Sequence, residues 1–96
     1  GYTLEKVDSV PELKLKAYQL IHNKTQAQHL HIAKDDDNNL LGILLRTPPL
    51  DNTGVAHILE HLVTCGSSRY ACKDVFMRMT TRSLATFMNA FTGNYF

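Results

Sequence analysis

The sequence predicts an α+β fold in which an antiparallel or mixed β-sheet is covered by helices on one face. Apolar and polar residues alternate through residues 13–22 and again through 29–34, which is typical of half-buried strands. Two proline-free stretches come afterwards: 54–65 has helix-boundary residues, and 73–83 has apolar residues at a loose helical spacing. Because the strands come first along the chain and the helices follow, the order favours separate β and α layers.

The first part of the chain predicts two paired strands. Residues 1–12 are mixed in character and contain Pro11, so we expect an irregular or extended lead-in there. A strand follows at 13–22, and a second strand follows at 29–34. The residues between them begin with Asn-Lys-Thr at 23–25, a turn sequence that suits a hairpin. We therefore expect the two strands to pair in antiparallel fashion.

A third strand is predicted at residues 40–45, which read LLGILL. The polar run DDDNN at 35–39 precedes it and has the chemistry of a turn or connection. The apolar run is short and nearly continuous, which indicates a strand that is buried on both faces. Pro48 and Pro49 would end this strand, because proline cannot donate a backbone hydrogen bond to the sheet.

The first helix is predicted at residues 54–65. The residues at 51–53, Asp-Asn-Thr, are all good N-cap residues, so the helix is expected to begin directly after them. Gly66 is well placed as the residue that follows the helix end.

A second helix is predicted at residues 73–83, where apolar residues recur at a loose helical spacing. Residues 84–89 could extend this helix. The mixed aromatic and polar residues at 90–96 are expected to begin a final strand.

Length and composition limit the classes of function. The chain has 96 residues, of which 44% are apolar, so it can form one small domain with a modest core. Its net charge of +1 argues against nucleic acid as a partner. Because it shows neither a long apolar run nor a signal-peptide pattern, the sequence also predicts no membrane partner. Cys65 and Cys72 are too few for a disulfide framework.

The chemistry is concentrated in residues 57–61, HILEH. On a helical wheel His57, Glu60 and His61 occupy one arc of about 100°, and the apolar residues of the helix occupy the opposite side. Two imidazoles at this spacing can bind one zinc ion. Glu60 on the same face can take a proton from a water molecule that the zinc activates. The order of the residues is that of the inverted HxxEH motif of zinc peptidases.

An ordinary structural interpretation of the same residues also stands. Histidine pairs at this spacing occur on solvated helix faces that bind no metal, and short motifs arise by chance. His29 and His31 likewise share one face of a predicted strand, and an exposed polar face explains them without a metal. The five residues of the motif alone leave both interpretations open.

The segments around the motif carry a resemblance to a known family. The segment RTPPLDNTGVAHILEHLVTCGSSRYACKDVF at 46–76 and the segment RSLATFMNAFT at 82–92 resemble the inverzincin peptidases of the pitrilysin family. The opening at 10–47 resembles the start of the N-terminal domain of such an enzyme. Within the family, the chain is most similar to the mitochondrial branch that degrades peptides. The resemblance implies that residues 1–96 are a single, partial N-terminal metallopeptidase domain.

The resemblance also implies roles for particular residues. His57 and His61 would be zinc ligands, and Glu60 would be the general base. In this family a strand that lines the active site pairs with the backbone of the substrate. The residues that match this strand are Asn89, Ala90, Phe91 and Thr92.

The implied protein is a zinc metalloendopeptidase with Zn²⁺ as its cofactor. Its substrates would be short unstructured peptides, such as cleaved mitochondrial targeting peptides, and its location would be the mitochondrial matrix. The residues themselves show no transit peptide. The remaining domains of a full-length enzyme would be its partners, since the chain resembles only a part of one.

The sequence departs from the family pattern at the third zinc ligand. The family uses a glutamate far downstream of the second histidine, whereas here Asp74 is the only acidic residue after Glu60. A catalytic zinc ion normally has three protein ligands. Cys65 is too far along the helix from His57, by about 12 Å, to share a zinc ion with it easily. The alternative function is therefore a catalytically incomplete, peptidase-like fragment that acts as a binding or structural module.

Overall fold

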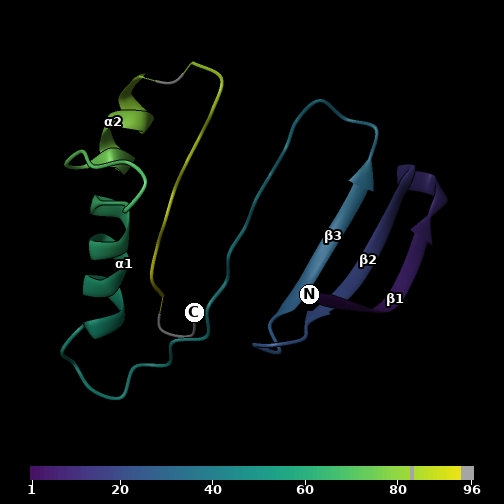
Figure 1. Cartoon of the computed structure of the whole chain (residues 1–96), viewed down its shortest axis with the longest axis horizontal. Coiled ribbons are helices and arrows are strands. Elements are labelled where there is room, and N and C mark those ends of the chain that lie inside the picture. The colour runs from purple at the N-terminus through teal and green to yellow at the C-terminus, as the bar shows by residue number, and fades with distance from the viewer. Residues whose placement is uncertain (83, 94–96) are drawn as a thin grey trace. The chain divides into compact units, whose positions relative to one another are not determined.

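The computed structural model describes residues 1–82 and 84–93. The chain forms two compact units, Gly1–Leu41 and Gly42–Phe96 (Figure 1). The first unit holds a three-stranded antiparallel sheet, and the second holds two α-helices. This content confirms the predicted α+β class and the antiparallel pairing. That helices cover one face of the sheet, and that 1–96 is a single partial domain, stay predictions.

The sheet has the strand order β1-β2-β3, and each strand pairs with its neighbour in the sequence. The strands are β1 (Tyr2–Val10), β2 (Leu15–His22) and β3 (Gln28–Lys34). The predicted turn at 23–25 is confirmed between β2 and β3. Both predicted strands of the hairpin are therefore confirmed, although β2 begins two residues later than expected.

The lead-in at 1–12, predicted to be irregular or extended, is mostly extended, because most of it is the strand β1, which the sequence did not predict as a strand. The register of β1 against β2 shifts between Leu4 and Lys6, which marks a bulge or irregularity. A bulge interrupts the period-two alternation by which a strand is recognised in a sequence. Pro11 does not interrupt the ladder, because it lies beyond the strand at the start of the short 3-10 helix η1 (Pro11–Leu13).

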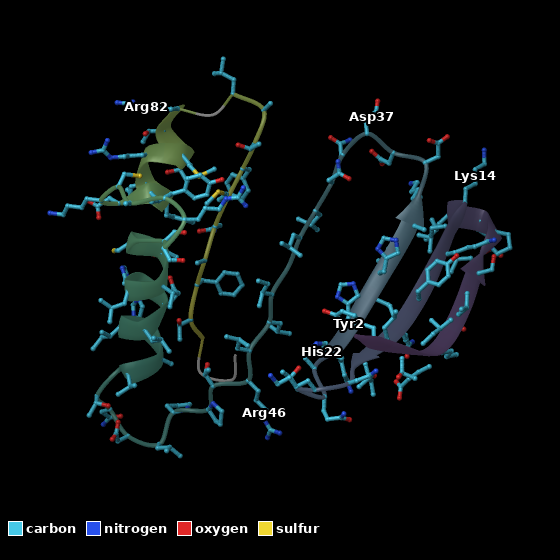
Figure 2. All side chains as sticks on the ribbon, viewed as in Figure 1. Tyr2, Lys14, His22, Asp37, Arg46 and Arg82 are labelled. Carbon is cyan, nitrogen blue, oxygen red and sulfur yellow. The ribbon has the colours of Figure 1, made fainter. Side chains whose placement is uncertain are left out.

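The register of the sheet confirms the predicted alternation of faces. Ala17 lies opposite Ile32 and therefore shares a face with it, whereas Tyr18 lies opposite His31 on the other face. The Tyr18 and His31 rings lie 6.0 Å apart between centroids. At one end of the sheet the Tyr2 and His22 rings, labelled in Figure 2, approach to 4.9 Å. The histidines of this face thus have aromatic neighbours.

The predicted strand at 40–45 is wrong, because these residues form no regular element. Leu40, Leu41 and Ile43 are 99%, 81% and 80% exposed. A strand buried on both faces needs a paired neighbour and a layer on each side. Within the described residues this run has no paired strand and no covering layers, so its apolar side chains are exposed to solvent.

The predicted first helix is confirmed as α1 (Val55–Cys65), but its N-cap differs from the expectation. Gly54 is the N-cap, with a φ of 70°, and no side chain caps the helix. Glycine adopts this left-handed conformation at little cost. Asp51 instead accepts hydrogen bonds within the preceding turn, from the Thr53 backbone N–H at 3.0 Å and from the Thr53 hydroxyl. Gly66 follows the helix end as predicted, in an extended conformation.

The predicted second helix is confirmed as the shorter α2 (Val75–Arg82). Asp74 precedes it with a φ of 57°, a conformation that cannot continue a right-handed helix. The Asp74 backbone N–H donates to the Cys65 carbonyl oxygen at 3.0 Å, which joins the start of α2 to the end of α1. Residue 83, which was expected to end the helix, lies outside the described residues.

The described residues after α2 form neither the helical extension nor the strand that the sequence suggested. Residues 84–89 do not extend α2, and residues 90–93 form no strand. The remainder of the expected strand, 94–96, lies outside the described residues. Figure 1 shows the segment 84–93 as an extended trace that runs back along the two helices.

Apolar side chains are largely exposed in both units, and no described residue is fully buried. The apolar side of α1 is an example, since its large side chains remain between 54% and 68% exposed: Val55, Ile58, Leu59, Leu62 and Val63. Extended apolar surfaces of this kind are typical of interfaces. The core that the composition predicts is therefore not formed by the described residues. None of their helices is both long and apolar enough to cross a membrane.

The turn before α1 permits a prediction about acid pH. Two hydrogen bonds from Thr53 hold the pKa of the Asp51 carboxyl below its ordinary value. The bond from the Thr53 hydroxyl has the larger effect, and the bond from the Thr53 backbone N–H has the smaller one. The stability that this carboxylate contributes is therefore present above the ordinary pKa and lost as the pH falls through the lowered one. We expect Thr53→Val to raise the pKa of Asp51 part of the way back, because the backbone donor remains. Titration of the Asp51 carboxyl carbon by NMR measures this, and an unchanged pKa would contradict it.

Candidate metal centre

The two histidines of the HILEH motif face each other on α1. The Nε2 atoms of His57 and His61 lie 3.0 Å apart, and their ring centroids lie 4.8 Å apart. Both side chains are exposed. Two nitrogens that bind one zinc ion in tetrahedral geometry are separated by about 3.3 Å, given Zn–N distances near 2.05 Å. The pair is thus within a few tenths of an ångström of the separation that zinc requires.

Glu60 lies on the same helix and is held from a distant part of the chain. The hydroxyl of Thr92 donates a hydrogen bond to Glu60 Oε2 at 2.7 Å. Thr92 belongs to the extended segment after α2, and both side chains are half-buried. This contact brings the segment that was expected to bind substrate against the helix that carries the motif.

The motif and this segment line one open pocket of about 360 Å³. Three groups of residues form its walls: His57, Glu60, His61, Thr64 and Cys65 from α1, Asp74, Phe76 and Met77 from the start of α2, and Ala90, Phe91 and Thr92 from the extended segment. Six of the seven predicted site residues therefore lie around one space. Asn89 is not part of the lining, and its Oδ1 accepts a hydrogen bond from the Ala90 backbone N–H at 3.0 Å.

The donor set fits a zinc ion only in part. Two imidazole nitrogens are suitable ligands and lie at a suitable separation. Among the described residues, however, no group of three or more His, Cys, Asp or Glu side chains is placed to hold a metal ion. Cys65 and Asp74 line the pocket without forming such a group with the histidines. Cys65 and Cys72 are both free thiols.

No family model matches the chain, but proteins of known name match almost all of it. The presequence protease, mitochondrial, of Danio rerio is 56% identical over 94 residues, which are 98% of this chain and 9% of that protein. The proteins of the same name from Mus musculus and Saccharomyces cerevisiae are each 52% identical, over 98% and 97% of this chain and 9% of their own lengths. The chain is similar to one short segment of the presequence proteases.

The similarity to presequence proteases confirms the resemblance that the sequence predicts. It extends over both compact units of the chain, since it covers nearly every residue. The chain spans about a tenth of the length of these presequence proteases. The roles assigned to His57, Glu60, His61 and residues 89–92 stay predictions.

Some features of the site could not be found from the sequence. The hydrogen bond between Thr92 and Glu60 joins residues that are 32 positions apart, so no local pattern indicates it. The position of Asp74 at the pocket depends on its left-handed backbone and on its bond to the end of α1. The position of Cys65 at the pocket could have been found from the sequence, because Cys65 follows His61 by one helical turn on the same side of the helix.

Proposed function

We propose that the chain is part of a mitochondrial zinc metalloendopeptidase that hydrolyses short unstructured peptides, such as cleaved targeting peptides. The observation that carries this proposal is the pair of imidazole nitrogens 3.0 Å apart, in one pocket with Glu60. The names of the similar proteins, which are proteases and mitochondrial, support both the activity and the location. The matrix is the compartment that we infer from the family resemblance.

The zinc ion would be held by Nε2 of His57 and Nε2 of His61. A bound zinc ion would supply a Lewis acid that lowers the pKa of a water molecule to about 7. Such a centre needs a third protein ligand, and the described residues offer none. Because the matched segment is 9% of the relatives' length, we propose that further domains of a longer protein provide this ligand. The same domains would cover the exposed apolar side of α1.

Glu60 would act as the general base. Its carboxylate lies in the pocket beside the two imidazoles, and Oε2 is engaged by the Thr92 hydroxyl. The carboxylate would accept a proton from water as the peptide carbonyl is attacked. It would then return that proton to the amine that leaves, which is the usual work of a positioned carboxyl group.

The segment at 89–92 would bind the peptide through its backbone. Ala90, Phe91 and Thr92 of this segment line the pocket, and the segment belongs to no sheet. An extended peptide could therefore pair with it by strand addition, which recognises backbone groups rather than particular side chains. This mode of binding suits a protease of many short, unfolded substrates.

A second candidate is a binding or structural module without catalysis. The absence of a third ligand among the described residues favours it. Metal removal from the full-length protein separates the two functions. We expect a chelator to abolish hydrolysis of a short unstructured peptide, and added zinc to restore it. Hydrolysis that persists after the metal has been removed would refute the zinc mechanism, and a protein that binds peptides but never cleaves them would support the module.

A further inference from the structure

The contact between Thr92 and Glu60 carries an inference about the side chain of Thr92. The Thr92 hydroxyl is 2.7 Å from Glu60 Oε2, and both residues line the pocket that the two imidazoles face. This separation is at the long end of the range of about 2.5–2.7 Å for a hydrogen bond from a hydroxyl to a carboxylate. Such a charge-assisted hydrogen bond is stronger than one between neutral groups. Because Thr92 is half-buried, its hydroxyl meets less competition from water than an exposed one would.

A glutamate side chain on an open helix face samples many rotamers, and a base is effective only within hydrogen-bond reach of the proton that it takes. We propose that Thr92 is a positioning residue whose hydroxyl holds the Glu60 carboxylate in the pocket beside His57 and His61. This inference rests on the proposed role of Glu60 as the base. It separates the side chain of Thr92, which engages the base, from the backbone of residues 89–92, which is left to pair with the peptide.

Two variants distinguish this role from substrate binding. Thr92→Val keeps the shape of the side chain but removes the hydroxyl, whereas Thr92→Ser keeps the hydroxyl. In the zinc-loaded full-length protein we expect Thr92→Val to lower kcat by about 10²-fold with KM unchanged, because a displaced catalytic group costs about that much. Thr92→Ser should restore most of the rate. A rise in KM at unchanged kcat would overturn the proposal and assign Thr92 to substrate binding.

A matched control is available on α2. The exposed Thr81 hydroxyl donates to the Met77 and Arg78 carbonyl oxygens at 3.0 and 3.3 Å, and Thr81 itself does not line the pocket. Thr81→Val therefore removes a threonine hydroxyl from the same unit without touching Glu60. We expect it to leave both kcat and KM unchanged. A loss of kcat equal to that of Thr92→Val would overturn the proposal, because the effect would not be specific to the Glu60 contact.

A second readout requires neither metal nor activity. Three-bond couplings measured by NMR report the rotamers of the Glu60 side chain in the metal-free chain. We expect one dominant rotamer in the unchanged protein and in Thr92→Ser, and averaged couplings in Thr92→Val. Averaged couplings in the unchanged protein would overturn the proposal. The two proposals can fail separately. If Glu60→Gln leaves hydrolysis intact, the role of Glu60 as the base is refuted. If the couplings of Glu60 in the unchanged protein and in Thr92→Val still differ as expected, the contact between Thr92 and Glu60 stands.

Discussion

In the full-length protein, Glu60→Gln is expected to lower the turnover of a short unstructured peptide by about 10²–10⁴-fold, the usual contribution of a general base. Glutamine has the size of glutamate, and its side-chain oxygen can still accept the hydrogen bond that the Thr92 hydroxyl donates to Oε2 of Glu60. An amide, however, cannot take a proton from water near neutral pH. Turnover of a fluorogenic peptide and zinc content are the two quantities to measure, and the zinc content should not change.

The control for this substitution is Glu12→Gln. Glu12 is exposed in the short helix η1 of the first unit, outside the pocket residues. The same loss of charge at that position should leave turnover unchanged. If Glu60→Gln retains robust hydrolysis, Glu60 is not the base, whatever the zinc content of the protein.

The second large effect is expected on zinc affinity when either imidazole is removed. His57→Ala or His61→Ala deletes one of two facing nitrogens that lie 3.0 Å apart. We expect each to weaken zinc binding by at least about 100-fold, since even losing a residue that only orients a ligand typically costs 10–100-fold. Competition with a zinc-sensitive dye measures the affinity of each variant.

The sheet supplies the matched control for the histidines. His31 of β3 lies opposite Tyr18 of β2 and shares a strand face with His29, so His29 and His31 are a second histidine pair on one face of an element. His31→Ala should leave zinc affinity unchanged. Loss of zinc in that variant, with His57→Ala unaffected, would move the metal site to the sheet.

The features that the sequence predicts well are those with a local period. The helix that carries His57, Glu60 and His61 was predicted from the N-cap residues before it and the glycine after it, and α1 begins and ends within one residue of that prediction. The alternation in β2 and β3 likewise identified both strands and their faces. In these elements the spacing of neighbouring residues alone determines which side chains share a face.

The features that it predicts poorly depend on distant parts of the chain. The run at 40–45 is apolar enough for a buried strand, but a strand also requires a partner and cover that the described residues do not provide. Strand β1 was missed because a register shift near Leu4 breaks its alternation. The position of Thr92 against Glu60 results from the return of the chain after α2, which no local pattern indicates.

Calorimetric titration of zinc into the metal-free full-length protein tests most directly whether HILEH is a metal centre. We expect one zinc ion per protein molecule, with a dissociation constant on the order of micromolar or tighter, corresponding to about 8 kcal/mol. The heat of binding should be absent from the double variant His57→Ala, His61→Ala. Absence of binding in the unchanged full-length protein, or binding that survives in the double variant, would contradict a zinc centre at His57 and His61.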